Sequence, residues 1–294
     1  MTLTHADVVD DTIESETRSC RYAARDPDPD AVLFHSRPFL RLPLNQASGR
    51  REDYNNMLRR VTDSLRQFGF FPGLLYLADR TLRRLSSHLG LYVYELMVQP
   101  IGSKPLLSEH HARNLRHVQM DRGHPEVDTM PARPEIKASR FDQGAVCLGV
   151  YAGEKLIGYS WFCFNAYRED EVRCTYELAL PDESVFDFDF YVLPEHRMGF
   201  GFMAVWHTVN QFLRMRGIRY TFSRVTRFNM ASRRAHARLG AKCIGRTVVL
   251  QAWGFEGMLA TVKPYAWISW RSTPRPRIRL APPSTCQAET VDGP

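Results

Sequence analysis

Two glycines beside the start of a predicted helix are the first feature of this sequence that could bind a ligand. Gly199 and Gly201 lie in the segment "LPEHRMGFGF", between a predicted strand and a helix predicted over about residues 199–216. The first N–H groups of a helix lack partners within the helix and lie at the positive end of its dipole. Glycines there let an anion approach the backbone, so this pattern is typical of a phosphate site.

The charges around these glycines favour the same interpretation. Between Phe190 and Leu250 the sole acidic residue is Glu195, whereas the stretch contains 11 lysines and arginines. Such an excess of positive charge within one segment indicates a local phosphate site, although a solvated basic face would have the same composition. The pattern G-x-x-x-x-G-K-[ST] of a nucleoside triphosphate site does not occur, and the strand-rich context argues against a dinucleotide fingerprint.

Two carboxylates in an aromatic strand could act on protons. Asp187 and Asp189 lie in "SVFDFDFYVL", where strict alternation would place both on one face with Tyr191. A buried carboxylate without a partner is costly, so each is either a base, an anchor for a cationic substrate, the partner of an arginine on an adjacent strand, or exposed. Glu177, on the preceding strand, is a third candidate.

The predicted elements that must position these residues form an α+β domain. We expect a strand at residues 91–100, a helix from Ser108 to about Val118, a loop at 121–140, a β-hairpin at 145–165, two strands, the helix at 199–216, a strand, a helix capped by Asn229, and final strands at about 242–253 and 257–267. This order predicts a mixed, mostly antiparallel central sheet flanked by helices.

The domain boundaries follow from changes in composition. Residues 1–50 are mostly irregular, and residues 51–90 form an N-terminal helical extension interrupted by Pro72 and Gly73. Residues 91–270 form the main domain. The segment 271–294 is rich in proline, so we expect a disordered tail.

Two stretches resemble motifs of the GNAT superfamily of N-acyltransferases. The stretch "FYVLPEHRMGFGFMAVWHTVNQFLRMRGIRYTFSRV" looks like the family's fourth strand, pyrophosphate loop, helix and fifth strand. The stretch "NMASRRAHARLGAKCIG" looks like its next helix. The likeness covers about residues 90–270 in element order and is specific over about 184–245. It implies the GNAT fold and acetyl-CoA, or another acyl-CoA, as cofactor.

The resemblance also implies which residues hold the cofactor. The pantetheine arm would pair with the fourth strand, a backbone N–H near Tyr191 to Leu193 would polarise the thioester carbonyl, and the amides of the turn would bind the pyrophosphate. The implied cofactor residues are Tyr191, Val192, Leu193, His196, Arg197, Met198, Gly199, Phe200, Gly201 and Phe202, with Asn229 and Arg233 on the following helix. The family's loop usually opens with Arg or Gln, but here that spacing selects His196. If Arg197 is the family's arginine, the loop is one residue short.

Direct attack by an amine is the reaction that the resemblance implies. Because an alkyl ammonium has a pKa of about 10, a base or a water relay must first remove a proton, and the departing thiolate needs a donor. Asp189 falls where some members carry an acid, and Asp187 is the second candidate base. His236 occupies the position of the tyrosine that donates to the thiolate in many members; it could equally be a helix-surface histidine.

Composition limits the remaining classes of protein. The net charge of +7 and pI near 9.2 favour an anionic partner. The six cysteines show no C-x-x-C pair, so we predict no metal site. The first residues lack the apolar core of a signal peptide and no apolar run is long enough to span a bilayer, so we expect a cytoplasmic enzyme.

Three hypotheses for function follow from the sequence. The first is acylation of the amine of a small molecule, with no nucleic acid as partner. The second is a membrane-associated acyltransferase of a lipid or envelope-polysaccharide pathway, because the region 52–89 is amphipathic and basic. The third is a degenerate domain that binds coenzyme A or a protein partner. The oligomeric state and the acceptor stay open.

Overall fold

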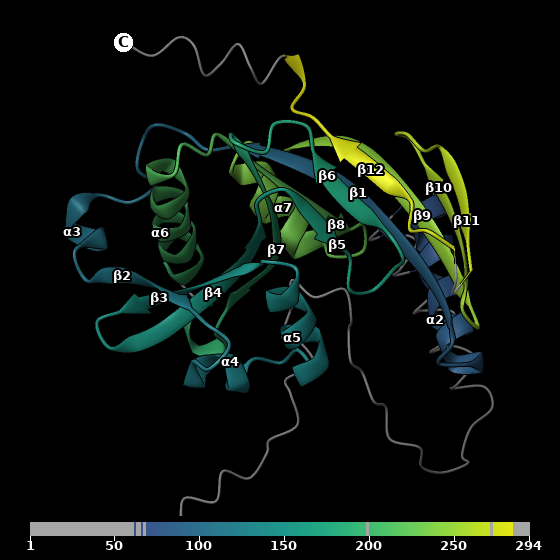
Figure 1. Cartoon of the computed structure of the whole chain (residues 1–294), viewed down its shortest axis with the longest axis horizontal. Helices are drawn as coiled ribbons and strands as arrows, with labels where there is room; N and C mark the ends of the chain where they lie inside the picture. The colour runs from purple at the N-terminus through teal and green to yellow at the C-terminus, as the bar shows by residue number, and fades with distance from the viewer. Residues whose placement is uncertain (1–61, 63–65, 67–68, 198–199, 271–272, 285–294) are drawn as a thin grey trace, which may run out of the picture.

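The computed structural model describes residues 62, 66, 69–197, 200–270 and 273–284, and these fold into two sheets with flanking helices (Figure 1). The larger sheet contains β1 (Leu89–Pro100), β2 (Leu115–Met120), β3 (Val146–Ala152), β4 (Lys155–Cys163), β7 (Ser184–Val192), β8 (Tyr220–Thr226), β9 (Lys242–Ala252), β10 (Phe255–Ala260) and β11 (Ala266–Ser269). The smaller contains β5 (Ala166–Arg168), β6 (Thr175–Leu178) and β12 (Arg277–Leu280). The helices are α2 (Phe70–Leu85), α3 (Glu109–Ala112), α4 (Pro125–Thr129), α5 (Pro134–Asp142), α6 (Gly201–Met215) and α7 (Met230–Arg238), with a 3₁₀ turn η1 (Pro194–His196).

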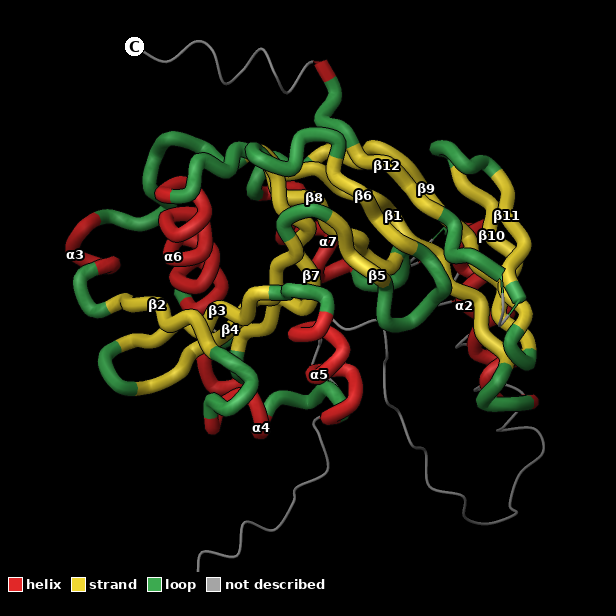
Figure 2. Tube along the Cα trace, viewed as in Figure 1, coloured by secondary structure: helices red, strands yellow, loops and turns green. Residues whose placement is uncertain are grey.

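The order of the larger sheet is β11-β10-β9-β1-β8-β7-β4-β3-β2. Neighbouring strands are antiparallel except β7 and β8, which are parallel. The predicted fold class, a mixed and mostly antiparallel sheet flanked by helices, is therefore confirmed (Figure 2).

The large sheet has a separate apolar core on each face. On one face α6 packs over β2, β3, β4 and β7, and Phe190 of β7 stacks on Trp206 of α6 with ring centroids 4.5 Å apart. On the other face the small sheet supplies Tyr176 and Ile278, which pack with Tyr94 of β1. Because alternate side chains of one strand serve both cores, the central strands read as nearly continuous apolar runs.

Strand β1 lies in the middle of the large sheet, between β8 and β9. Its residues Tyr94, Leu96 and Val98 are buried. Helix α2, which precedes β1, is tied to it because the carboxylate of Asp79 accepts hydrogen bonds from the Leu91 N–H at 2.9 Å and from Arg83 at 2.7 Å. Pro72 lies in the first turn of α2, where no intrahelical N–H is needed, so it does not interrupt the helix.

Several predicted elements were wrong, and their errors have physical causes. The helix expected at 108–118 is the short α3 followed by β2, because pairing with β3 overrides the local helical preference. The expected loop at 121–140 contains α4 and most of α5, each of which has a proline in its first turn, where proline is favoured. The strand expected at 257–267 is a hairpin of β10 and β11.

The predicted disordered tail is also wrong over residues 277–280. These residues form β12, which pairs in parallel with β6 and buries Ile278 and Leu280. The predicted irregular segment 1–50 lies outside the described residues, and the extension predicted at 51–90 is described chiefly at α2. The division into domains stays a proposal. Within the described part of the chain, no helix combines the length and apolar character needed to cross a membrane.

Candidate functional site

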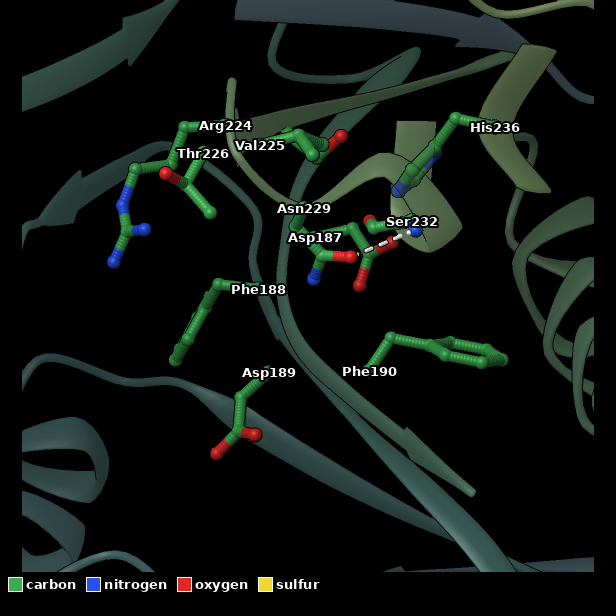
Figure 3. Close-up of a pocket in the computed structure, with 11 residues that line it drawn as sticks. Asp187, Phe188, Asp189, Phe190, Arg224, Val225, Thr226, Asn229, Ser232 and His236 are labelled. Atoms are coloured by element: carbon green, nitrogen blue, oxygen red, sulfur yellow. Dashed lines mark hydrogen bonds between the residues drawn. The ribbon is translucent and has the colours of Figure 1, made fainter. Parts of the chain in front are cut away.

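The parallel strands β7 and β8 separate part-way along their length. They pair from Ser184 to Phe186 on β7, opposite Tyr220 to Phe222 on β8. Beyond that point a cavity opens between them and α7 (Figure 3). It is lined by Asp187, Phe188, Asp189 and Phe190 of β7, by Ser223, Arg224, Val225 and Thr226 of β8, and by Asn229, Ser232 and His236.

A β-bulge changes the direction of β7 at this cavity. The register with β4 shifts between Tyr159 and Trp161, and Asp189 takes a left-handed backbone with φ 56°. That conformation is rare for a residue other than glycine and is concentrated at functional sites. The bulge breaks the alternation of side chains. The prediction that Asp187 and Asp189 share a face is therefore wrong: Asp187 contacts Ser160, whereas Asp189 contacts Arg140 of α5, near Phe188 and Trp161.

Asp187 is a buried carboxylate with a near-neutral pKa. The Ser160 hydroxyl donates to its Oδ1 atom at 2.7 Å. Burial raises the pKa of Asp187 to about 7; the hydrogen bond from Ser160 opposes this rise, and the nearby Asp189 adds to it. A carboxylate with this pKa can exchange a proton near neutral pH.

Asp189 forms an ion pair with Arg140. The side chains are 3% and 4% exposed, and Arg140 also donates to Asp170 at 2.8 Å. Burial disfavours the guanidinium charge, but the carboxylates of Asp189 and Asp170 outweigh it and raise the pKa of Arg140 above its usual range. One of the alternatives for Asp189 is an ion pair with an arginine on an adjacent strand. The structure shows an ion pair, but its arginine belongs to helix α5. Its role as a base stays a prediction.

His236 is buried on the side of α7 that lines the cavity (Figure 3). Burial lowers its pKa to about 4, so the imidazole is neutral at physiological pH. Its Nδ1 atom lies 3.3 Å from Oε1 of Gln99 on β1, and it packs edge-on against Trp206. The helix-surface alternative for His236 is therefore wrong, because the side chain is buried; a neutral imidazole here can still hydrogen-bond, and its role towards the thiolate stays a prediction.

The turn after β7 is closely packed. The Leu193 N–H donates to Ile157 O at 3.0 Å, and the guanidinium of Arg197 donates to Val192 O at 3.0 Å while lying 5.1 Å from the ring centre of Tyr191. A Cβ atom on Gly201 would lie 1.8 Å from His196 O, so this position accepts only glycine without rearrangement. His196 ends the 3₁₀ turn and contributes this carbonyl.

Helix α6 begins at Gly201 without side-chain capping among the described residues. Its first turn also lacks acidic residues. The first amides of α6 lie at the positive end of the helix dipole, a position that favours an anion. Phe200 is exposed and stacks on His111. Met198 and Gly199 lie outside the described residues.

The two cofactor residues predicted on α7 have different surroundings. Asn229 caps α7, with its side chain accepting from the Ser232 N–H at 2.9 Å, and lines the cavity. Arg233 instead pairs at 2.7 Å with Glu95, a buried residue of β1. Glu177 pairs with Arg277 of β12 at 2.7 Å and does not line the cavity.

Sequence reasoning missed the residues that support this site from other elements. These are Gln99 on β1, Arg140 on α5, Ser160 on β4, and Glu95, which also pairs with Arg227 and Arg246. A polar residue within an apolar run, such as Glu95 in "LYVYELMV", was the available signal. The partner of each residue could not be read from the sequence because it lies far along the chain.

Comparison with known proteins gives one family match. Residues 112–241 match the family described as Acetyltransferase (GNAT) family. A search of curated proteins found no match.

Solved structures with related folds are distant in sequence. One is a conserved protein of unknown function from Staphylococcus epidermidis, 14% identical, with 58% of this chain and 65% of that chain covered and a TM-score of 0.38. A tandem GNAT protein from the clavulanic acid biosynthesis pathway is 15% identical, with 55% and 53% covered and a TM-score of 0.38. A GCN5-related N-acetyltransferase from Kribbella flavida is 13% identical, with 62% and 65% covered and a TM-score of 0.34. The chain thus spans less than two thirds of each, and these likenesses do not establish an activity.

Proposed function

Because residues 112–241 match the acetyltransferase (GNAT) family, we propose that this protein transfers an acyl group from acyl-CoA to the amine of a small molecule. The observation that supports this most directly is the separation of β7 from β8 beside the start of α6, where the described residues provide no side-chain cap. This arrangement offers a cavity for the reacting groups and backbone amides for an anionic cofactor within one continuous segment.

The residues present fit an acyl-CoA. Gly201 brings the turn within van der Waals distance of the start of α6, where a side chain would fill the space. The start of α6 at Gly201 would bind the pyrophosphate, and Asn229 would contact the pantetheine arm. When bound, acyl-CoA supplies the thioester carbonyl that the amine attacks.

Val192 is the best-placed backbone donor for the carbonyl oxygen. The Leu193 N–H faces β4, since it donates to Ile157 O. Successive peptide groups of a strand point to opposite edges, so the backbone groups of Val192 face away from β4. The bond from Arg197 to Val192 O agrees with this direction. The Val192 N–H would stabilise negative charge that develops on the oxygen.

Asp187 is the proposed base. Its raised pKa of about 7 lets it accept a proton from an alkyl ammonium, directly or through water, and release it again to solvent. Ser160 holds the carboxylate through Oδ1. His236 is neutral and would hydrogen-bond within the cavity rather than act as a cationic acid.

Calorimetry with acetyl-CoA followed by thiol release against a panel of amines tests the proposal. We expect micromolar binding and turnover on at least one amine, with kcat rising with pH through about 7 because the base must be ionised. Asp187→Asn should lower kcat by about 100-fold and remove that step in the profile, with little change in acetyl-CoA affinity. Absence of acetyl-CoA binding would refute the cofactor assignment. Binding without turnover on any amine would favour the degenerate-domain hypothesis.

A further inference from the structure

Helix α2 turns an apolar stripe away from the protein. Phe70, Leu74 and Leu85 recur at helical spacing and are exposed, with Phe70 at 71% and Leu85 at 73%. The polar residues Asp79 and Arg83 face β1 instead, where Asp79 binds the Leu91 N–H. Exposed apolar area of this extent usually marks a surface that contacts a partner.

The face of the large sheet that α2 covers continues this apolar surface beyond the helix. Leu91 of β1 lies opposite Leu250 of β9, which is followed across the sheet by Gly257 and Ile268. Residues directly opposite one another share a face, so Leu250 and Ile268 lie on the side that carries Leu91. Both are exposed, Ile268 at 70%. Figure 1 shows α2 behind β9, β10 and β11, on the side of the sheet away from β12.

Trp253, in the turn between β9 and β10, contacts the segment that follows α2. Its N–H donates to His88 O at 3.2 Å, three residues after α2 ends, and its side chain is exposed. We call the set of Phe70, Phe71, Leu74, Leu85, Leu250, Trp253 and Ile268 the outer apolar surface.

The charges that border the outer apolar surface are strongly positive. Helices α2 and α7 carry three arginines each, and their one acidic residue, Asp79, is paired with Arg83. Phe228, just before α7, contacts Tyr76 of α2 with ring centroids 5.2 Å apart, so the two helices are close. Three arginines, one of which is Arg233 of α7, surround the single buried carboxylate of Glu95 on β1 and leave an excess of two positive charges there.

Of those three arginines, Arg246 is the most accessible. Its side chain is 58% exposed. It lies opposite Glu95 on β9, four residues before Leu250, so alternation places it on the side of the sheet that carries the outer apolar surface. The apolar surface and the excess positive charge therefore face the same way.

We propose that the outer apolar surface binds an anionic lipid bilayer peripherally. Aromatic and leucine side chains would enter the boundary between headgroups and acyl chains, while the arginines would bind lipid phosphates. Charge favours this occupant over a second copy of the chain. In a two-fold contact the same surface meets itself, so the arginine-rich borders would face each other and repel.

Vesicle co-sedimentation of the full chain tests this inference independently of acyl transfer. The probes are vesicles of phosphatidylcholine alone and of phosphatidylcholine with 30 mol% phosphatidylglycerol, in about 50 mM and 300 mM salt. We expect binding to the anionic vesicles that weakens at the higher salt, because electrostatic attraction is screened. Leu74→Ser with Leu85→Ser should weaken it about tenfold or more through lost apolar burial, and Arg246→Gln should weaken it less.

Met215→Ser is the matched control, since the exposure of Met215 lies between those of Leu74 and Leu85 but the residue is at the end of α6. It should leave vesicle binding unchanged. Absence of binding to anionic vesicles at low salt, or equal binding by the double leucine variant, would overturn the proposal. Light scattering tests the alternative that a second copy of the chain binds this surface. A dimer that the double leucine variant converts to a monomer would support that alternative and overturn the proposal.

Discussion

The buried carboxylate of Asp187 should make the protein less stable as pH rises, and Asp187→Asn should remove this effect. The pKa of Asp187 is raised by burial to about 7, from an ordinary value of 3.8. Because the folded-state pKa lies above the unfolded one, the contribution of this group to stability is fully present below about pH 4. It is lost as pH rises through 7.

The size of the effect follows from the difference between the two pKa values. At 1.36 kcal/mol for each pH unit, the lost stability relative to a neutral side chain is roughly 1.5 kcal/mol at pH 5 and roughly 4 kcal/mol at pH 8.5. The amide of Asn can still accept the hydrogen bond from Ser160, so packing and hydrogen bonding change little.

Urea denaturation of the two proteins at pH 5 and pH 8.5 measures this difference. We expect the advantage of Asp187→Asn in the free energy of unfolding to grow by about 2 to 3 kcal/mol between these pH values. Other titrating groups cancel because they are common to both proteins. An advantage that does not change with pH would show that the pKa of Asp187 is not raised, and the proposed base would lose its physical basis.

Two other substitutions test the remaining parts of the site. Gly201→Ala should weaken acetyl-CoA binding at least about tenfold by calorimetry, because its Cβ atom would displace the turn at His196 O. The control is Gly102→Ala, since the space around Gly102 is open. Unchanged affinity of Gly201→Ala would refute the assigned turn. Arg140→Met should lower the free energy of unfolding by about 3 to 5 kcal/mol, because it leaves the buried Asp189 carboxylate without its arginine. Adding Asp189→Asn should restore part of this loss, and a loss below about 1 kcal/mol would contradict the ion pair's structural role.

Local sequence patterns predicted the strand, turn and helices in which we propose the cofactor site. The strand before Leu193, the helix start at Gly201 and the cap at Asn229 depend on residues that are neighbours in sequence, and the structure contains all three. Gly217 and Gly240, which follow α6 and α7 in the sequence, have the positive φ angles that favour glycine after a helix.

Contacts between residues far apart in the sequence determine the features of the fold and site that sequence patterns could not predict. Alternation placed Asp187 and Asp189 together, and only the register shift against β4 separates them. The arginine that balances Asp189 comes from α5, in a segment predicted as a loop, although a proline occupies the first turn of this helix. The strand at Arg277–Leu280 exists because β6 offers it an edge, which composition could not reveal.

The central position of β1 has a consequence for how the chain can be cut or synthesised. The family match begins at residue 112, after β1 has ended. A fragment that began there would lack the strand that joins β8 to β9, leaving an open edge on each side of the gap. During synthesis β1 emerges well before its partners β8 and β9, so at least one edge of this apolar strand stays unpaired until β9 leaves the ribosome.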